Sequence, residues 1–259
     1  MKIKIKRTVW PSMFTLANMF LGYLAIMQIF QGASCSAEDP SYFHRKIILA
    51  GWLVFIGSIL DGLDGKVARL IHGSSDFGVE IDSLADLLTF VITPSIMIYF
   101  VYANDIAIVG VAISFLYVIF GTIRLARFNV IAHRLSPTHF IGLPSPLAAI
   151  TAMSIPMFSL AWFDHPGKAK IVIPFMIILG FLMVSNITFK KFSHFSLRKD
   201  SSFRRDTLIV LINLILTIIY REKILLILTA LTVIANILSY WKKTNVAEDE
   251  FELDEEEEV

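Results

Sequence analysis

The chain has 259 residues, of which 56% are hydrophobic and 17% are charged, and its formal net charge is +1. A soluble domain carries more charged and fewer apolar residues, so this composition excludes an ordinary soluble protein. The single cysteine, Cys35, excludes an internal disulfide and a metal site built from cysteines. Several apolar runs reach the ~20 residues that a helix needs to cross a bilayer. The sequence therefore predicts an all-α, polytopic membrane protein.

Eight membrane-spanning helices are predicted along the chain. The first apolar run, 9–30, follows a basic start and exceeds the ~7–15 residues of a signal-peptide core, so we expect it to be retained as a helix. The later helices are separated by polar stretches or by turns that contain Pro and Gly. They are expected over 46–70, 80–102, 106–128, 144–162, 171–189, 207–220 and 223–240.

The chain is expected to divide into four parts. Residues 1–192 form a core of six helices, and 193–206 form a basic loop. Two additional transmembrane helices follow within 207–243. The tail, 244–259, is a block of acidic residues that we expect to be disordered, because like charges repel one another.

The distribution of basic residues predicts the orientation in the membrane. Eight crossings place both termini on one side, and the termini and connections on that side carry 17 Lys and Arg, against six on the other. Cytoplasmic loops are the ones enriched in Lys and Arg. We therefore expect an integral membrane protein with both termini and the functional site in the cytoplasm, at the inner membrane if the cell is bacterial.

Acidic residues gather at one edge of two neighbouring apolar segments. Asp61 and Asp64 are three residues apart on one helix face, and Asp82 and Asp86 are four apart on the next helix. Carboxylates in or near a membrane segment are costly unless a cation or a proton pathway needs them. Oxygen ligands without His or Cys suit Mg²⁺, Mn²⁺ or Ca²⁺, so the two helices are predicted to hold divalent metal. The competing interpretation is a set of interfacial charges that cap helices, which suits Asp76 and Glu80 better than these four.

The residues around the aspartates are consistent with a phosphate ligand. Gly65 and Gly78 leave room beside the backbone, Arg69 can pair with a phosphate, and Ser75 offers a hydroxyl group. The stretch D-x-x-D-G-x-x-A-R-x8-G-x3-D-x3-D, from Asp61 to Asp86, resembles the signature of the CDP-alcohol phosphotransferases at every fixed position.

That resemblance covers about residues 8–190 and implies a membrane enzyme with six core helices. The family transfers a phosphatidyl or similar group from a CDP-linked lipid to an alcohol and releases CMP. The resemblance implies that two divalent ions, Mg²⁺ or Mn²⁺, are bound by Asp61, Asp64, Asp82 and Asp86, and that Asp86 is also the general base. It implies that Gly65, Arg69, Ser75 and Gly78 bind the CDP-lipid. A homodimer is expected from the resemblance alone.

The first helix also resembles its counterpart in the family, in which a Pro-Asn-x-x-Thr start lies near the nucleotide. Ser12 stands where Asn is usual, so Thr15 and Asn18 are the stronger candidates for contacts with the CDP-lipid. Hydrogen bonds between or within helices are an equally good interpretation of these two side chains.

Three further stretches resemble the phosphatidylserine synthase branch of the family, namely 124–130 (RLARFNV), 141–146 (IGLPSP) and 182–186 (LMVSN). Arg124 and Arg127 are three residues apart at the cytoplasmic end of their helix and are predicted to bind the acceptor, through the carboxylate of serine. The alternative is that they anchor the helix by reaching lipid phosphates.

The expected reaction is metal-dependent synthesis of phosphatidylserine from CDP-diacylglycerol and L-serine, with release of CMP. Other acceptors of the same family, glycerol 3-phosphate or an inositol phosphate, stay open, as does an ether-lipid donor. A cation transporter with a carboxylate-lined site is the alternative from a different class, although such sites usually lie at the midplane between broken helices. A non-catalytic membrane scaffold is a further alternative. Membrane lipid is the expected surrounding, and no nucleic-acid partner is expected.

Overall fold

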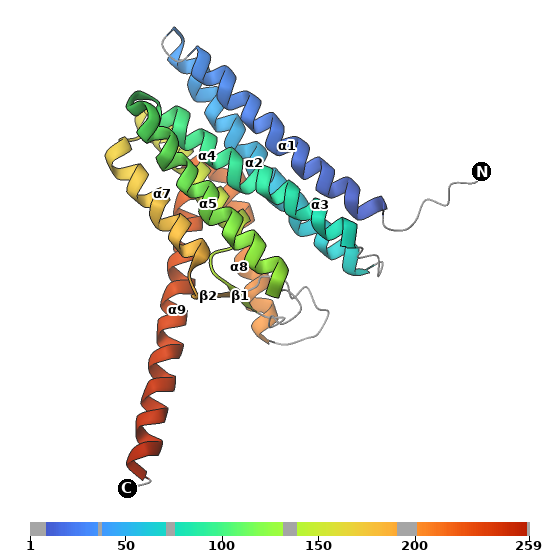
Figure 1. Cartoon of the computed structure of the whole chain (residues 1–259), viewed down its shortest axis with the longest axis vertical. Coiled ribbons are helices and arrows are strands. Elements are labelled where there is room, and N and C mark those ends of the chain that lie inside the picture. Colours follow the sequence, from blue (N-terminus) through green and yellow to red (C-terminus); the bar gives the residue numbers. More distant parts are fainter. Residues whose placement is uncertain (1–8, 36–37, 71–75, 132–138, 191–200, 258–259) are drawn as a thin grey trace, which may run out of the picture.

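The helices form a bundle in the computed structural model of the chain (Figure 1). This structure describes residues 9–35, 38–70, 76–131, 139–190 and 201–257. Six helical segments in these ranges are long and apolar enough to cross a membrane. They cover Met13–Ser34, Pro40–Asp64, Phe77–Ile106, Ile108–Val130, Ser145–Phe163 and Glu222–Lys242. The predicted sixth and seventh spans correspond to shorter apolar helices, Ala169–Val184 and Leu211–Tyr220. The class of a polytopic helical protein is therefore confirmed, whereas the count of eight crossings stays a prediction.

Nine α-helices, three irregular helical turns and two short strands follow one another in the described ranges (Figure 1). Their order is α1 (Val9–Ser34), α2 (Pro40–Leu70), α3 (Asp76–Asp86), η1 (Leu87–Ile92), α4 (Thr93–Ile98), η2 (Tyr99–Ala103), η3 (Asn104–Ile106), α5 (Ala107–Ile131), β1 (His139–Ile141), α6 (Ser145–Phe163), α7 (Ala169–Val184), β2 (Thr188–Lys190), α8 (Ser201–Tyr220) and α9 (Glu222–Glu257). Helix α2 begins six residues before the predicted start at 46, and α3 begins four before the predicted start at 80.

The segment from α3 to η3 crosses the bundle as one rod with two widened turns of π-helix, η1 and η2. Pro94 follows η1 and has no N–H to donate to the carbonyl group of Phe90, so a regular turn cannot form there. The Thr93 hydroxyl group instead donates to the carbonyl group of Leu88 at 2.8 Å. Widened turns of this kind re-aim the side chains on either side of them, and η1 begins directly after Asp86.

Helix α1 lies against α2 and against the start of the α3–η3 rod. Gly22 of α1 allows this approach, because a Cβ atom there would overlap the side chain and the backbone of Thr89 in η1. The Thr89 hydroxyl group donates to the carbonyl group of Asn18 at 3.1 Å. Small residues permit such close helix contacts in membranes, where packing and hydrogen bonds replace the hydrophobic effect. The contact fixes α1 beside the segment that carries the acidic residues.

A short two-stranded antiparallel sheet accompanies the helices and leaves the all-α class unchanged. Strand β1 pairs with β2 so that Phe140 faces Phe189. The sixth predicted helix, 171–189, therefore ends early, at Val184, where Ser185 adopts an extended conformation. Phe189 is buried, and the Gly142 N–H group donates to the carbonyl group of Ile187 at 2.9 Å. The strands close the end of the bundle beneath α5 and α7 (Figure 1).

The last two helices also differ from their predicted limits. Helix α8 begins at Ser201, inside the segment 193–206 that was predicted to be a loop. Helix α9 continues to Glu257 and so extends into the segment from residue 244 that was predicted to be a disordered tail. The tail contains no Gly or Pro and is rich in Glu, a good helix former, and it extends a helix that is already nucleated. Figure 1 shows α9 reaching well beyond the bundle.

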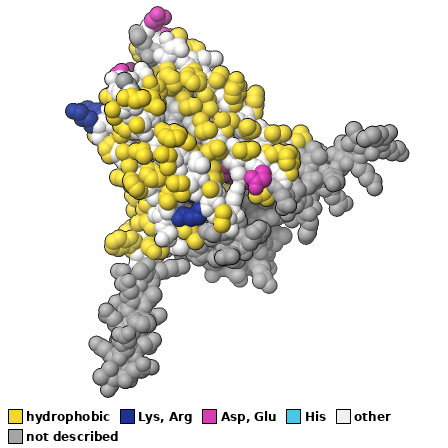
Figure 2. Space-filling view, in the orientation of Figure 1, with side chains coloured by type: hydrophobic (Ala, Val, Ile, Leu, Met, Phe, Trp, Pro, Cys, Tyr) yellow, Lys and Arg dark blue, Asp and Glu magenta, His cyan; other side chains and the backbone are white. Residues whose placement is uncertain are grey.

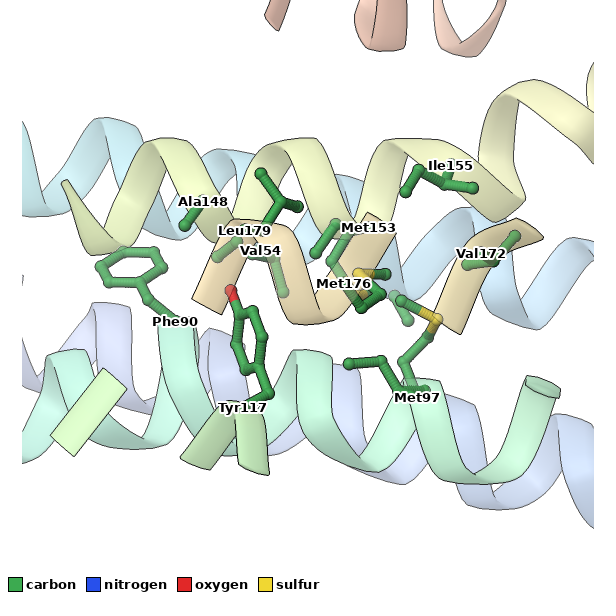
Figure 3. Packing of buried hydrophobic residues seen from close by; sticks show 14 of the residues in the cluster. Val54, Phe90, Met97, Tyr117, Ala148, Met153, Ile155, Val172, Met176 and Leu179 are labelled. Atoms are coloured by element: carbon green, nitrogen blue, oxygen red, sulfur yellow. The ribbon is translucent and has the colours of Figure 1, made fainter. Parts of the chain in front are cut away.

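Apolar side chains form both the interior and most of the exterior of the bundle. The interior cluster contains residues of most of the helices, and it includes Val54, Phe90, Tyr117, Met153 and Met176 (Figure 3). Figure 2 shows that hydrophobic side chains also cover most of the visible outer surface. An apolar exterior is stable in lipid rather than in water, so the chain is an integral membrane protein.

Candidate active site

Three carboxylates from α2 and α3 meet near one end of the bundle. One oxygen atom each of Asp61, Asp64 and Asp82 lies within 4.8 Å of the other two. Asp64 is buried, and the other two side chains are half-buried. Asp61 and Asp64 lie on the same face of α2 because three residues make almost one helical turn. Helices α2 and α3 both pack against α1, and this arrangement brings Asp82 of α3 within reach of the two carboxylates of α2.

Asp86 lies one turn beyond Asp82 on α3 and joins the same group. Its carboxyl group is within hydrogen-bonding reach of Asp61. One oxygen atom of Asp82 and one of Asp86 are buried and have no hydrogen-bond partner among the described residues. Buried carboxylate oxygens are normally hydrogen-bonded or bound to a metal. Four hard oxygen donors with two unpartnered buried atoms therefore fit a divalent cation.

Thr15 of α1 holds one of these carboxylates in place. Its hydroxyl group donates a hydrogen bond of 2.9 Å to Oδ2 of Asp64, across 49 residues of sequence. Both side chains are buried. Thr15 thus makes an interhelical hydrogen bond, which is the alternative interpretation given above, and this bond orients a candidate metal ligand. Its predicted contact with the CDP-lipid stays a prediction.

Asn18 lies one turn deeper in α1, beneath Thr15. Its side chain is fully buried, and neither the nitrogen nor the oxygen of the amide has a hydrogen-bond partner among the described residues. It lies against the helix surface at Gly57, one turn before Asp61. The structure thus places Asn18 directly under the carboxylates, without assigning a ligand to it.

Arg124 and Arg127 occupy different surroundings, although the sequence predicted one role for both. Arg124 is 6% exposed, and its charge acts on Asp86 and Asp61. Its Nη1 donates to Oγ of Ser145 at 2.5 Å, and its Nε has no hydrogen-bond partner among the described residues. This guanidinium group is therefore near the acidic cluster and has donor capacity left over.

Arg127 instead binds the backbone at the end of α7. Its Nη1 donates to the carbonyl group of Val184 at 2.8 Å. Its Nη2 donates to the carbonyl groups of Ile141, Met183 and Ser185 at 3.1 to 3.3 Å. These carbonyl groups belong to the exposed end of a helix dipole and to β1, so a cation stabilises them. Arg127 thus binds backbone carbonyl groups, although its charge also acts on Arg124, and its predicted contact with the acceptor stays a prediction.

The remaining predicted ligand residues are described only in part by the structure. Gly78 is half-buried in the first turns of α3. Gly65 and Arg69 are in the last turns of α2, and their side chains lie outside the described part of the structure. Ser75 lies outside the described residues altogether. Their predicted contacts with the CDP-lipid stay predictions.

Sequence reasoning overlooked several polar residues around the site. Ser145 is fully buried and receives the hydrogen bond from Arg124. Asn129 of α5 donates to Oγ of Ser83 at 2.9 Å and so ties α5 to α3 next to Asp82. The position of Ser145 near the site could have been predicted from the sequence, because this residue follows Pro144 at the start of a helix on the same side as the aspartates. Asn129 lies two residues after Arg127 in the stretch already noted, but its partner could not be read from the sequence.

The fold and the site together define a class of protein: an integral membrane protein whose bundle holds an acidic cluster suited to a divalent cation. A model of the CDP-alcohol phosphatidyltransferase family matches residues 8–190, and the chain belongs to this family. The matched range contains α1 to α7 and every residue of the cluster. The family resemblance predicted from the sequence is thereby confirmed.

Curated relatives cover most of the chain. The CDP-diacylglycerol–serine O-phosphatidyltransferase of Helicobacter pylori is 40% identical over 185 residues, which are 71% of this chain and 73% of that protein. The Bacillus subtilis protein of the same name is 34% identical over 190 residues, 71% of this chain and 90% of its own length. The archaetidylserine synthase of Methanothermobacter thermautotrophicus is 32% identical over 186 residues, 70% and 69% of the two chains.

Proposed function

We propose that this protein transfers the phosphatidyl group of CDP-diacylglycerol to the hydroxyl group of L-serine and releases CMP. The observation that carries the proposal is the position of Arg124, whose charge acts on Asp86 at the edge of the carboxylate cluster. A base and a fixed cation side by side suit an acceptor that has both a hydroxyl and an anionic group. The names of the bacterial relatives support serine as that acceptor.

The carboxylates supply the site for the activated lipid. Asp61, Asp64 and Asp82, with Asp86, would hold divalent cations, for which we propose two ions of Mg²⁺ or Mn²⁺. When bound there, such cations would neutralise charge on the diphosphate and on the departing CMP. Thr15 keeps Asp64 oriented for this task. Arg69, Ser75, Gly65, Gly78 and Asn18 complete the proposed surroundings of the CDP-lipid.

Asp86 is the proposed general base. It takes the proton of the serine hydroxyl group as the serine oxygen forms a bond to the β-phosphorus atom. The bond from that phosphorus to the oxygen of CMP breaks, and CMP leaves with the bonding electrons. Arg124 holds the carboxylate of serine, so that the hydroxyl group faces Asp86. Arg127 supports this arrangement indirectly, because it fixes the end of α7 and strand β1 beside α5.

The proposed orientation places both termini and the active site in the cytoplasm. It rests on the excess of Lys and Arg on that side of the sequence. Soluble serine and CMP would then reach and leave the site from the cytoplasm, while the acyl chains of the donor stay in the adjacent leaflet. A homodimer is also proposed, from the family resemblance.

Incubation of the purified protein with labelled donor and single acceptors tests the proposed function. CDP-diacylglycerol, Mn²⁺ or Mg²⁺, and one acceptor at a time are supplied, and the release of CMP is followed. L-serine should be the acceptor that is used, and a chelator should stop the reaction. Release of CMP with glycerol 3-phosphate or an inositol phosphate, but not with serine, would overturn the acceptor assignment. A parallel set with a CDP-activated ether lipid tests the donor, because one relative is an archaetidylserine synthase.

A further inference from the structure

A second layer of side chains lies directly under Asp86 and Arg124. Phe90 follows Asp86 by one turn on the α3–η3 rod, and Ala148 follows Ser145 by almost one turn on α6. Tyr117 precedes Arg124 by two turns on α5. Phe90, Ala148 and Tyr117 belong to one buried cluster, and Figure 3 shows the Tyr117 ring projecting from α5 into the interior of the bundle. These three side chains form a buried layer next to Asp86 and Arg124.

The Tyr117 hydroxyl group is a polar group within an otherwise apolar layer of side chains. The residue is 2% exposed, and its hydroxyl group has no hydrogen-bond partner among the described residues. Arg124 lies close enough for its charge to act on this hydroxyl group. A buried Tyr hydroxyl usually has a partner, since an unpaired polar group in a low-dielectric interior is costly. A phenylalanine would fill the same space without that cost.

Arg124 and its two neighbours, Ser145 and Tyr117, offer three hydrogen-bond donors. Arg124 has an unpartnered Nε–H group, and Tyr117 has its hydroxyl group. Ser145 accepts from Nη1 of Arg124, so its own hydroxyl hydrogen is available to donate. The acidic groups that act on Arg124 are Asp86 and Asp61, on the side of the metal cluster. A set made of donors matches an anionic acceptor group, and a carboxylate can accept several hydrogen bonds at once.

We propose that Tyr117 and Ser145 join Arg124 in a pocket that binds the carboxylate group of an amino-acid acceptor, with the hydroxyl group of that acceptor directed at Asp86. This inference rests on the proposed function and extends it to the basis of acceptor selection. A site built for hydrogen bonds strongly rejects an analogue that lacks the bonded group, because its own donors are then left unpaired. Alcohols without the carboxylate should therefore be poor acceptors.

Replacement of Tyr117 by phenylalanine tests the pocket, because it removes one oxygen atom and keeps the ring. Steady-state release of CMP is measured with L-serine and with serinol, which has the amino and hydroxyl groups but no carboxylate. A hydrogen bond to a charged group is worth a factor of about ten or more. Tyr117→Phe should raise the KM for L-serine about tenfold, leave the KM for CDP-diacylglycerol unchanged, and reduce the preference for L-serine over serinol by the same factor. Ser145→Ala should shift these constants in the same direction.

Tyr102 provides a matched control. It is also a buried tyrosine, but its hydroxyl group donates to the carbonyl group of Pro166 at 2.6 Å, in the turn between α6 and α7. Tyr102→Phe should lower thermal stability and leave both KM values unchanged. An unchanged preference for L-serine in both Tyr117→Phe and Ser145→Ala would overturn the proposed pocket. Wild-type protein that does not use L-serine at all would instead overturn the proposed function, so the two failures are distinguishable.

Discussion

The hydroxyl group of Thr15 on α1 donates a hydrogen bond to the carboxylate of Asp64 on α2, at 2.9 Å. The bond joins the first helix to the acidic cluster and uses one of the two oxygens of Asp64. Outer hydrogen bonds of this kind fix the orientation of a metal ligand. The first helix is thus part of the site rather than only a membrane anchor.

Thr15→Val removes this hydrogen bond and keeps the shape of the side chain. Loss of an outer hydrogen bond to a metal ligand typically lowers metal affinity by about 10–100-fold. We expect the Mn²⁺ concentration needed for half-maximal release of CMP to rise by a factor in this range. Thr15→Ser, which keeps a hydroxyl group, should restore the wild-type requirement. An unchanged Mn²⁺ requirement in Thr15→Val would show that Asp64 does not depend on this bond for a metal role.

Asp86→Asn separates the proposed base from the proposed metal ligands. The amide cannot take a proton from the acceptor, so kcat should fall by about 10²–10⁴-fold, the usual contribution of a general base. Much of the binding of the CDP-lipid should remain, because Asp61, Asp64 and Asp82 are unchanged. Binding is measured with labelled CDP-diacylglycerol, and Asp61→Asn is the comparison that should lose both. Equal loss of binding in the two variants would argue that Asp86 acts only as a ligand.

The two arginines should respond differently to replacement. Arg124→Ala should raise the KM for serine more than the KM for the CDP-lipid, because Arg124 lies beside Asp86. Arg127→Ala removes the donor of hydrogen bonds to four carbonyl groups and should destabilise the protein by about 2–3 kcal/mol, on the scale of bonds made by charged groups. Kinetic constants at low temperature and the midpoint of thermal inactivation in detergent measure the two effects. A selective rise in the KM for serine in Arg127→Ala would show that Arg127 contributes to acceptor binding.

Gly57 and Gly62 form a matched pair on α2, on either side of Asp61. A Cβ atom at Gly57 would lie 2.8 Å from Oδ1 of Asn18 and 3.1 Å from Cγ2 of Thr89, whereas one at Gly62 would meet nothing within 4 Å. Gly57→Ala should therefore push α2 away from α1 and cost about 1–3 kcal/mol, as overpacking does. Gly62→Ala should be neutral or up to about 1 kcal/mol stabilising, because Ala favours helix. Thermal inactivation compares them, and equal midpoints would contradict the close packing at Gly57.

The sequence was sufficient to predict the acidic cluster because its geometry is local. Spacings of three and four residues on two consecutive helices place Asp61, Asp64, Asp82 and Asp86 on facing surfaces once the helices pack. Apolar length was likewise sufficient for most of the helices. The same reasoning could not distinguish Arg124 from Arg127, because both lie on one helix and differ only in the distant segments that they contact.

The features that were missed depend on contacts between distant segments. Strands β1 and β2 have three residues each and lie some 50 residues apart, so they show no recognisable alternation. Tyr117 lies in an apolar run and has the pattern of a core residue, and its proximity to Arg124 depends on the fold. The disorder predicted for the acidic tail followed from its charge, whereas helix propensity and continuity with α9 favour the helix observed there.

The central claim is that the aspartates of α2 and α3 bind divalent cations. Titration of the purified protein with Mn²⁺, followed by the electron paramagnetic resonance signal of the free ion, tests it most directly. The wild-type protein should bind Mn²⁺, and Asp61→Asn and Asp64→Asn should lose most of this binding, while Gly62→Ala keeps it. Equal binding by the wild-type protein and the two aspartate variants, or binding by none of them, would contradict the account.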